Sequence, residues 1–260
     1  MNIAFAFSGF LVGALVGLTG MGGGSVMTPV LILLFGVHPV AAVGTDLLFA
    51  AVTKATGTRV HAYRGNVDWR IVAFLAAGSI PGVLATLAVM ARVPVHSHIL
   101  AHTVTVAIGV VLLIAAAGLL FERRVERLTA SLLGDQRSIT PAGTRRLTAG
   151  LGLLLGIVVT LTSIGAGAAG IVVLRQLYPG MLAARLVGSD LAHAVPLTLL
   201  AGSGHWLVGD IQWRLLLSLL IGSLPGVIIA SRFAHRIPDH ILRRLLGLVL
   251  TGIAATMLMS

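Results

Sequence analysis

Long apolar segments alternate with short polar connections along the whole chain. Residues 3–19, 40–58, 71–91 and 99–121 are apolar, and polar stretches separate them. An apolar helix of about 20 residues is long enough to cross a hydrocarbon layer of about 30 Å. The pattern predicts an all-α polytopic membrane protein with about 8 to 10 transmembrane or re-entrant helical segments.

One apolar segment is interrupted by glycines. The stretch GALVGLTGMGGGSVMTP, residues 13–29, begins as an apolar helix, breaks at Gly22, Gly23 and Gly24, and resumes after Pro29. Non-helical backbone within a membrane is tolerated only where protein or a water-filled cavity pairs its polar groups. A glycine break of this kind therefore indicates a binding site at the centre of the protein, on a re-entrant hairpin or a discontinuous helix.

The second half of the chain repeats the first. At an offset of 143, Thr19, Gly22 and Gly24 match Thr162, Gly165 and Gly167; at an offset of 144, Gly44-Thr45-Asp46 matches Gly188-Ser189-Asp190, and His61 matches His205. Agreement at so many positions indicates an internal duplication. We expect a first repeat at residues 1–121, a basic cytoplasmic linker at 122–146 and a second repeat at 147–260.

Basic residues predict that the two repeats have opposite orientations. Lys and Arg are frequent at 54–70 but sparse in the matching region 205–214, whereas they are sparse at 92–98 but frequent in the matching region 232–244. Cytoplasmic loops are the ones enriched in Lys and Arg. With the linker in the cytoplasm, this bias gives an odd number of crossings in each half and two inverted repeats.

Composition agrees with an integral membrane protein. The 260 residues are 57% hydrophobic and 10% charged, and the mean hydropathy is +1.02. The formal net charge of +10 lies between apolar spans, so it reflects membrane orientation and not nucleic-acid binding. Cysteine is absent, which excludes disulfides. We also expect no cofactor and no metal, because no such motif occurs.

The two glycine breaks are the expected anion site. A helix N-terminus has free N–H groups and the positive end of a dipole, which favour an anion. A tight helix crossing is the alternative explanation of the glycines. The candidate substrate-binding residues are Gly22, Gly23, Gly24, Ser25, Thr28, Gly165, Gly167 and Lys54.

Four duplicated side chains are candidates for coupling transport to protons. Asp46 and Asp190 lie in apolar segments, where acidic residues are costly and usually face a wet path or a partner. They could instead cap helix N-termini. His61 and His205 could relay protons or could simply be hydrogen-bonded at helix ends. Lys54 could neutralise an anion or pair with Asp46, and snorkelling to the membrane interface is its alternative.

Several ordered motifs are similar to those of a known family. GLTGMGGGSVMTPVL, AVGTDLLFAAVTKATG, HAYRGNVDW, LVGSDLAHAVPLTLLAGSGH and GDIQW resemble the TauE/SafE sulfite-exporter family of membrane permeases. The resemblance covers nearly the whole chain except 122–146. It implies a multi-pass carrier of the bacterial inner membrane for small anions, mainly sulfite or organosulfonates.

Together these observations predict a secondary transporter that moves a small anion by alternating access. Its expected partners are the anion, the lipid bilayer and protons as coupling ion, and assembly into a homo-oligomer stays open. The alternatives are an anion channel and an intramembrane aspartyl protease, which would need both carboxylates close enough to share a proton. No Walker A pattern occurs, so the chain is not itself an ATP-driven pump.

Overall fold

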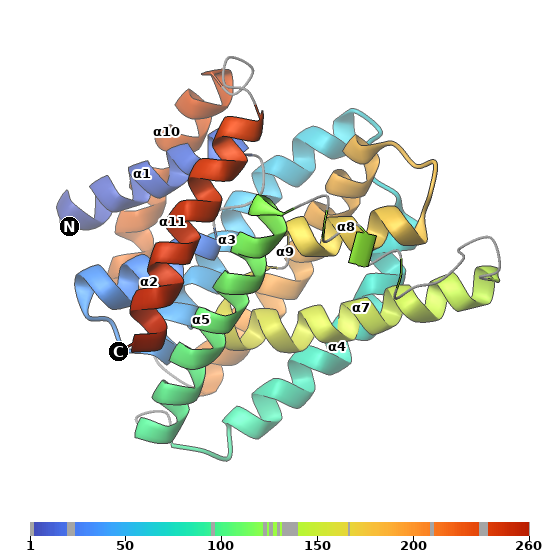
Figure 1. Ribbon diagram of the computed structural model, residues 1–260. Helices are drawn as coiled ribbons and strands as arrows, with labels where there is room; N and C mark the ends of the chain where they lie inside the picture. Colours follow the sequence, from blue (N-terminus) through green and yellow to red (C-terminus); the bar gives the residue numbers. More distant parts are fainter. Residues whose placement is uncertain are drawn as a thin grey trace.

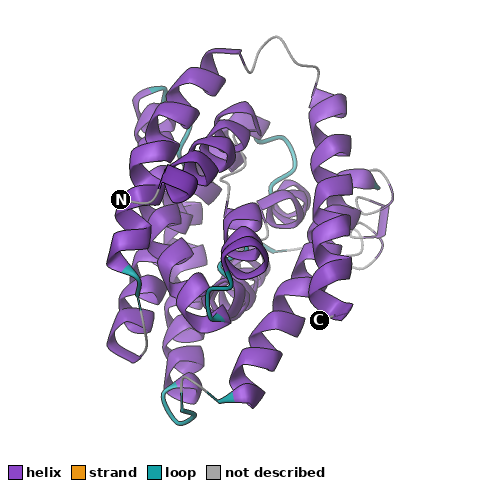
Figure 2. Ribbon diagram, turned by 90° about the vertical axis from the view of Figure 1, so that its left-hand side faces the viewer, coloured by secondary structure: helices purple, strands orange, loops and turns teal. Residues whose placement is uncertain are grey.

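The computed structural model describes residues 3–19, 24–94, 97–121, 140–165, 167–208, 211–233 and 239–259, together with Arg124, Arg127, Leu128 and Ser131. These residues form helices and short connections, with no strand among them (Figures 1 and 2). The all-α prediction is therefore confirmed for the described part of the chain. The helices of the first half are α1 (Ile3–Thr19), α2 (Gly24–Phe35), α3 (Pro39–Tyr63), α4 (Trp69–Met90) and α5 (His98–Leu120).

The second half has a matching series of helices. Its helices are α7 (Pro141–Thr162), α8 (Gly167–Leu177), α9 (Ala183–Val208), α10 (Trp213–Phe233) and α11 (Asp239–Met259). In both halves a short helix follows the glycine break, and three longer helices follow it. Helix α7 begins inside the expected linker, because Thr140 accepts a hydrogen bond from Gly143 N and Pro141 occupies the first helical turn.

Helices at equivalent places in the two halves pack against each other in opposite directions. Gly44 near the start of α3 contacts His205 near the end of α9, and Gly188 near the start of α9 contacts His61 near the end of α3. Helices α5 and α11 also run antiparallel, since Gly109 contacts Leu258 and Gly247 contacts Leu120. Figure 1 shows α5 beside α11 and α3 near α9.

The remaining large interfaces join one half to the other. Helix α1 packs along α10, and α4 packs along α7. In each pair a glycine face meets bare backbone: Gly9 and Gly13 of α1 lie against Leu219 and Ser223 of α10. Their equivalents, Gly152 and Gly156, lie against Leu75 and Ser79. The glycines at four-residue spacing thus serve close helix packing.

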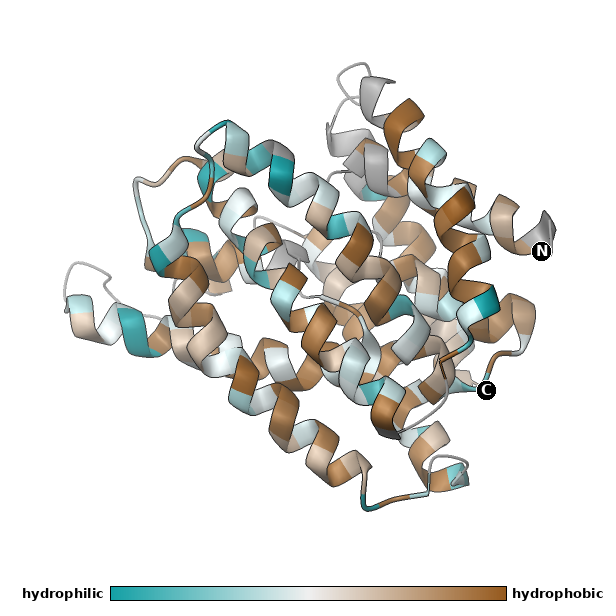
Figure 3. Cartoon of the chain, turned by 180° about the vertical axis from the view of Figure 1, so that it is seen from behind, coloured by the Kyte–Doolittle hydropathy of each residue, from teal (hydrophilic) through white to brown (hydrophobic). Residues whose placement is uncertain are grey.

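Within the described ranges, five helices are long and apolar enough to cross a membrane. They are Pro39–Tyr63, Trp69–Met90, His98–Leu120, Pro141–Thr162 and the Trp213–Ala230 part of α10. Large apolar side chains such as Leu84, Leu113 and Ile228 are exposed on their outer faces. In Figure 3 hydrophobic positions dominate the bodies of the helices, and hydrophilic ones gather mainly near loops and helix ends. Lipid is the solvent that such a surface suits.

Candidate functional site

The carboxyl group of Asp46 lies in the interior, on the third turn of α3. Thr28 of α2 donates a hydrogen bond to Asp46 Oδ2 at 2.5 Å, and both side chains are fully buried. The other carboxyl oxygen, Oδ1, is buried without a hydrogen-bond partner. Ser163, at the second glycine break, interacts through its hydroxyl with the same carboxyl group. Buried polar atoms that lack a partner are rare and indicate a place for a ligand or water.

Lys54 lies two turns further along α3 and is only 7% exposed. Its ammonium nitrogen is 3.4 Å from the point that a Cβ atom of Gly165 would occupy. The lysine amine therefore lies in van der Waals reach of position 165. The snorkelling interpretation of Lys54 is wrong, because its side chain is buried beside the glycine break.

Asp190 of α9 completes the arrangement. Lys54 interacts electrostatically with both Asp46 and Asp190. On the antiparallel helices α3 and α9, Lys54 lies between the levels of the two aspartates. We call Thr28, Asp46, Lys54, Ser163, Gly165 and Asp190 the central cluster. The sequence assigned five of them to the site from two different arguments, and Ser163 is the sixth.

The second glycine break has a defined backbone. Helix α7 ends at Thr162 and is followed by Ser163, whose φ of 58° is left-handed. Ile164 N donates to Thr162 Oγ1 at 3.1 Å. Helix α8 begins at Gly167, two residues after Gly165. Its free N–H groups therefore belong to the same region as the Lys54 amine.

The first break is only partly described. Gly22 and Gly23 lie outside the described residues, and so does the side chain of Ser25. Gly24 is the first residue of α2, which starts one turn before Thr28.

The duplicated Gly-Thr-Asp and Gly-Ser-Asp motifs do not cap helices. Helices α3 and α9 begin at Pro39 and Ala183, six residues before Thr45 and Ser189. Each hydroxyl instead accepts a backbone N–H from the turn of the other half: Asp68 N donates to Ser189 Oγ at 2.8 Å, and Gln212 N donates to Thr45 Oγ1 at 3.4 Å. The capping interpretation is wrong because both motifs lie inside helices.

The duplicated histidines occupy equivalent packing positions. His205 lies against Gly44, and its Nε2 is 2.8 Å from the carbonyl oxygen of Thr160. His61 lies against Gly188, and its Nδ1 is buried without a partner. The hydrogen bond to a main-chain carbonyl oxygen gives His205 a structural role. A proton-relay role for either histidine stays a prediction.

A third histidine has a polar partner that the sequence did not indicate. His193 Nε2 is 2.8 Å from Ser79 Oγ, and both are buried. His193 also interacts electrostatically with Lys54. Its equivalent in the first half is Phe49, which is fully buried. Comparison of the two halves position by position is the signal that could have found it.

The two aspartates are too far apart for an aspartyl protease. Since Gly44 faces His205 on an antiparallel helix, Asp46 is level with residue 203 of α9, thirteen residues from Asp190. At a rise of 1.5 Å per residue this is roughly 20 Å along the helix axis. Two carboxyl groups at that separation cannot share a proton.

Comparison with known proteins identifies the family. The family model for the sulfite exporter TauE/SafE matches residues 5–257. The chain belongs to the TauE/SafE family. The resemblance seen in the motifs is thereby confirmed, and the chain is a membrane transporter of the TauE/SafE type.

Individual relatives of the TauE/SafE family agree. The probable membrane transporter protein YjnA of Bacillus subtilis is 36% identical over 241 residues, which are 91% of each chain. YdhB of Bacillus subtilis, also a probable membrane transporter protein, is 26% identical over 90% of this chain and 91% of the relative. A probable membrane transporter protein of Xylella fastidiosa Temecula1 is 26% identical over 95% of this chain and 91% of its own length. No solved structure matches this chain.

Proposed function

We propose that this TauE/SafE protein is a secondary transporter that carries a small anion, most simply a sulfur oxyanion or organosulfonate such as sulfite, across the bacterial inner membrane. The observation that carries the proposal is the Lys54 amine, which is buried beside Gly165 at a break between two helices. A buried cation close to the free N–H groups at the start of α8 is suited to an anionic ligand. The name of the family supports a sulfur-containing anion.

The charge of the central cluster explains why protons would travel with the anion. One lysine faces two aspartates, so full ionisation leaves one excess negative charge. A further anion at this place would be repelled strongly, because charges in a low-dielectric interior interact over several ångströms. Protonation of one aspartate makes the cluster neutral, and protonation of both makes it positive. Anion and proton therefore bind together, and a pH gradient drives transport.

The packing of the halves supports alternating access by two inverted repeats. Equivalent helices α3 and α9 pack antiparallel, as do α5 and α11, which is the relation that an axis in the membrane plane produces. Helices α3 and α9 form the central pair. The short helix after each break packs on the long helix of its own repeat, α2 on α3 and α8 on α9. Rocking of one repeat against the other would open the cluster to each side in turn.

Uptake by proteoliposomes tests the proposal. Labelled sulfite, thiosulfate, an organosulfonate and sulfate are offered with and without an imposed pH gradient. We expect saturable uptake of one of these anions, several-fold faster with the gradient. Uptake that rises linearly with concentration and ignores the gradient would indicate a channel. Folded protein that moves none of them would end the sulfur-anion assignment.

Two variants test the coupling role of the aspartates. Asp46→Asn and Asp190→Asn each remove an ionisable carboxyl group and preserve the size of the side chain. We expect both to lose gradient-driven uptake by at least about tenfold, since an amide cannot take up and release the proton. Glu126→Gln, in the basic linker of the sequence, is the matched control and should transport normally. Full pH-driven uptake by both Asn variants would remove the coupling role.

A further inference from the structure

Two cavities of similar size lie at equivalent places in the two halves. The first, of about 790 Å³, lies at the start of α4 and is lined by residues that include Asp68, Arg70, Phe74 and Arg145. The second, of about 770 Å³, lies at the start of α10 and is lined by residues that include Gln212, Arg214 and Trp213. We call them the α4 cavity and the α10 cavity. Arg70 and Arg214 match at the offset of 144, so the duplication has placed one arginine in each.

The two cavities open at opposite ends of the molecule. The turn before α4 is bound by Ser189, near the start of α9, and the turn before α10 is bound by Thr45, near the start of α3. Since α3 and α9 run antiparallel, these two attachment points lie at opposite ends of the central pair. Arg70 and Arg214 therefore face opposite sides of the protein.

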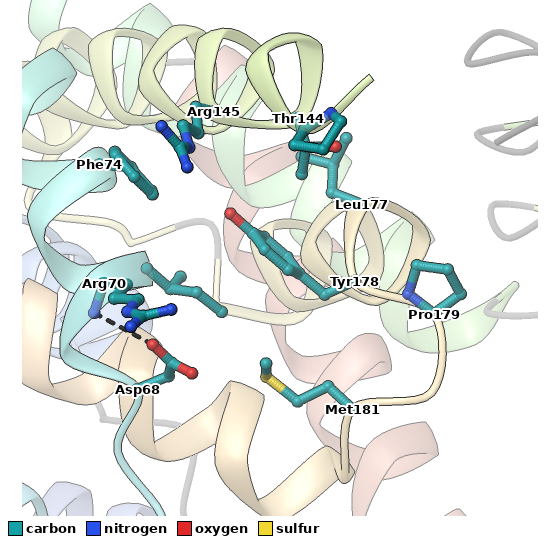
Figure 4. A pocket seen from close by; sticks show the side chains of 11 residues that line it. Asp68, Arg70, Phe74, Thr144, Arg145, Leu177, Tyr178, Pro179 and Met181 are labelled. Carbon is teal, nitrogen blue, oxygen red and sulfur yellow. Dashed lines mark hydrogen bonds between the residues drawn. The ribbon is translucent and has the colours of Figure 1, made fainter. Parts of the chain in front are cut away.

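The lining of the α4 cavity has an excess of positive charge. Among the described residues that line it, Asp68 is the one acid against Arg70 and Arg145, and its carboxylate is already engaged by Arg185 at 3.4 Å. The guanidinium of Arg145 lies 5.6 Å from the centre of the Phe74 ring, which orients it. Figure 4 shows the side chains of Arg70, Arg145 and Tyr178 directed toward the same space.

The α10 cavity keeps the arginine and changes the rest. Gln212 occupies the place of Asp68, so Arg214 is the one charged side chain among the lining residues that the structure describes. Phe5, Leu217 and Ile221 make the other walls apolar. The α10 cavity lacks both the acid and the second arginine of the α4 cavity. The net positive charge of the described lining residues is therefore the same in the two cavities. Preservation of that charge, while its neighbours changed, indicates an anionic ligand on both sides.

We propose that the α4 and α10 cavities are anion-binding antechambers, one at each face of the membrane, in which Arg70 and Arg214 collect a small oxyanion. A cavity with low-dielectric walls and one sign of charge raises the local concentration of the opposite ion. The α4 cavity binds more strongly, because Arg145 adds a second guanidinium there. The inference deepens the proposed function, since the collected anion is the one that passes to the central cluster.

Fluorescence quenching by iodide, an anionic probe, tests each cavity without any transport. The α10 cavity has its own reporter, Trp213, which is isolated by Trp69→Phe and Trp206→Phe. For the α4 cavity, a tryptophan reporter is introduced by Phe74→Trp after all three native tryptophans are replaced by Phe. Acrylamide, a neutral quencher, measures access alone.

We expect Arg214→Gln to lower iodide quenching of Trp213, and Arg70→Gln to lower that of the reporter introduced by Phe74→Trp, each at least about twofold. Acrylamide quenching should stay the same. Arg92→Gln, in the exposed connection between α4 and α5, is the matched control and should change neither. Iodide quenching that is unaffected by both cavity substitutions overturns the proposal.

Two further measurements separate the occupants and the hypotheses. If iodide loses access only in phosphatidylglycerol nanodiscs, and not in phosphatidylcholine ones, the occupant is a lipid headgroup and the free-anion proposal fails.

In oriented vesicles, Arg70→Gln should raise KM several-fold from the α4 side alone, and Arg214→Gln from the α10 side alone. Arginine-dependent quenching in a protein that transports none of the tested anions would retain the cavities and refute the proposed function. Normal transport together with quenching that does not depend on the arginines would retain the proposed function and refute the anion-binding cavities.

Discussion

The glycine interfaces and the central cluster show two different fates of one duplication. The α1–α10 and α4–α7 interfaces are copies of each other: Gly9 and Gly13 have the same surroundings as Gly152 and Gly156. The central cluster is not duplicated in this way. Lys54 of α3 is matched by Thr198 of α9, and His193 of α9 is matched by Phe49 of α3.

Where a glycine touches backbone, neither copy of the repeat can change its residue, whereas a polar centre can change residues in one copy alone. A side chain at Gly78 or Gly222 would collide with the carbonyl oxygen of Ala149 or Ala6, so neither copy tolerates change. A centre that binds one small ligand needs only one cation, and a second buried lysine would add the cost of desolvating another charge. The symmetric frame and the asymmetric charge are thus both consequences of packing and electrostatics.

The largest effect is expected from breaking the glycine interfaces. Gly78→Val and Gly222→Val each force a branched side chain onto a backbone carbonyl. Overpacking typically costs about 1–3 kcal/mol, and here the obstacle is backbone, so we expect more than about 3 kcal/mol. The measurement is the yield of monodisperse protein and its thermal stability in detergent. Gly150→Ala, on α7 with no atom within 4 Å, is the control and should be stable. Equal tolerance of all three would contradict the packing argument.

Replacing Lys54 by its counterpart tests the asymmetry of the centre. We expect Lys54→Thr to reduce anion uptake at least about tenfold, because the buried cation beside Gly165 is lost. Thr198→Val is the matched control at the equivalent place in the second half. Its hydroxyl donates to Ala194 O within its own helix, so uptake should remain within about twofold. The initial rate of labelled anion uptake decides between these outcomes, and loss in both variants would mean that the halves share the role.

The smallest effect is expected for the two duplicated serines of α4 and α10. Ser79→Ala leaves buried His193 without its partner, which costs about 1–3 kcal/mol. Ser223 bonds to Leu220 O of its own helix, so Ser223→Ala should stay within about 0.5 kcal/mol of the wild type. Thermal unfolding in one detergent measures both. A larger loss of stability for Ser223→Ala than for Ser79→Ala would contradict the different roles assigned to these two equivalent serines.

Much of the architecture follows from local features of the sequence. The apolar segments 3–19 and 99–121 predict helices whose ends differ from those of α1 and α5 by at most one residue. The glycine breaks, the duplication and the family are equally visible in the order of the residues. These features are local or periodic, and local sequence determines them.

Parts of the candidate site do not follow in this way. An offset of 144 shows that Thr45 and Ser189 are equivalent, but not that each holds the turn of the other half. Likewise, an offset cannot reveal that His193 meets Ser79 across 114 residues. An alignment of the two repeats shows which residues are equivalent. Which residues touch depends on how the two repeats are placed in space.

By itself, the sequence determined a polytopic helical protein with two related halves, two glycine breaks and a place in the TauE/SafE family, because hydrophobic length, glycine and repetition act locally. Only the tertiary structure decided that α1 pairs with α10, that α3 packs on α9 and α5 on α11, and that Lys54 turns inward to Gly165. The physical reason is that the long, flexible lysine side chain can point either way, and its charge is unfavourable in the interior unless neighbouring groups compensate it. The neighbouring helices, with Asp46, Asp190 and a glycine that leaves room, make the interior the more favourable place.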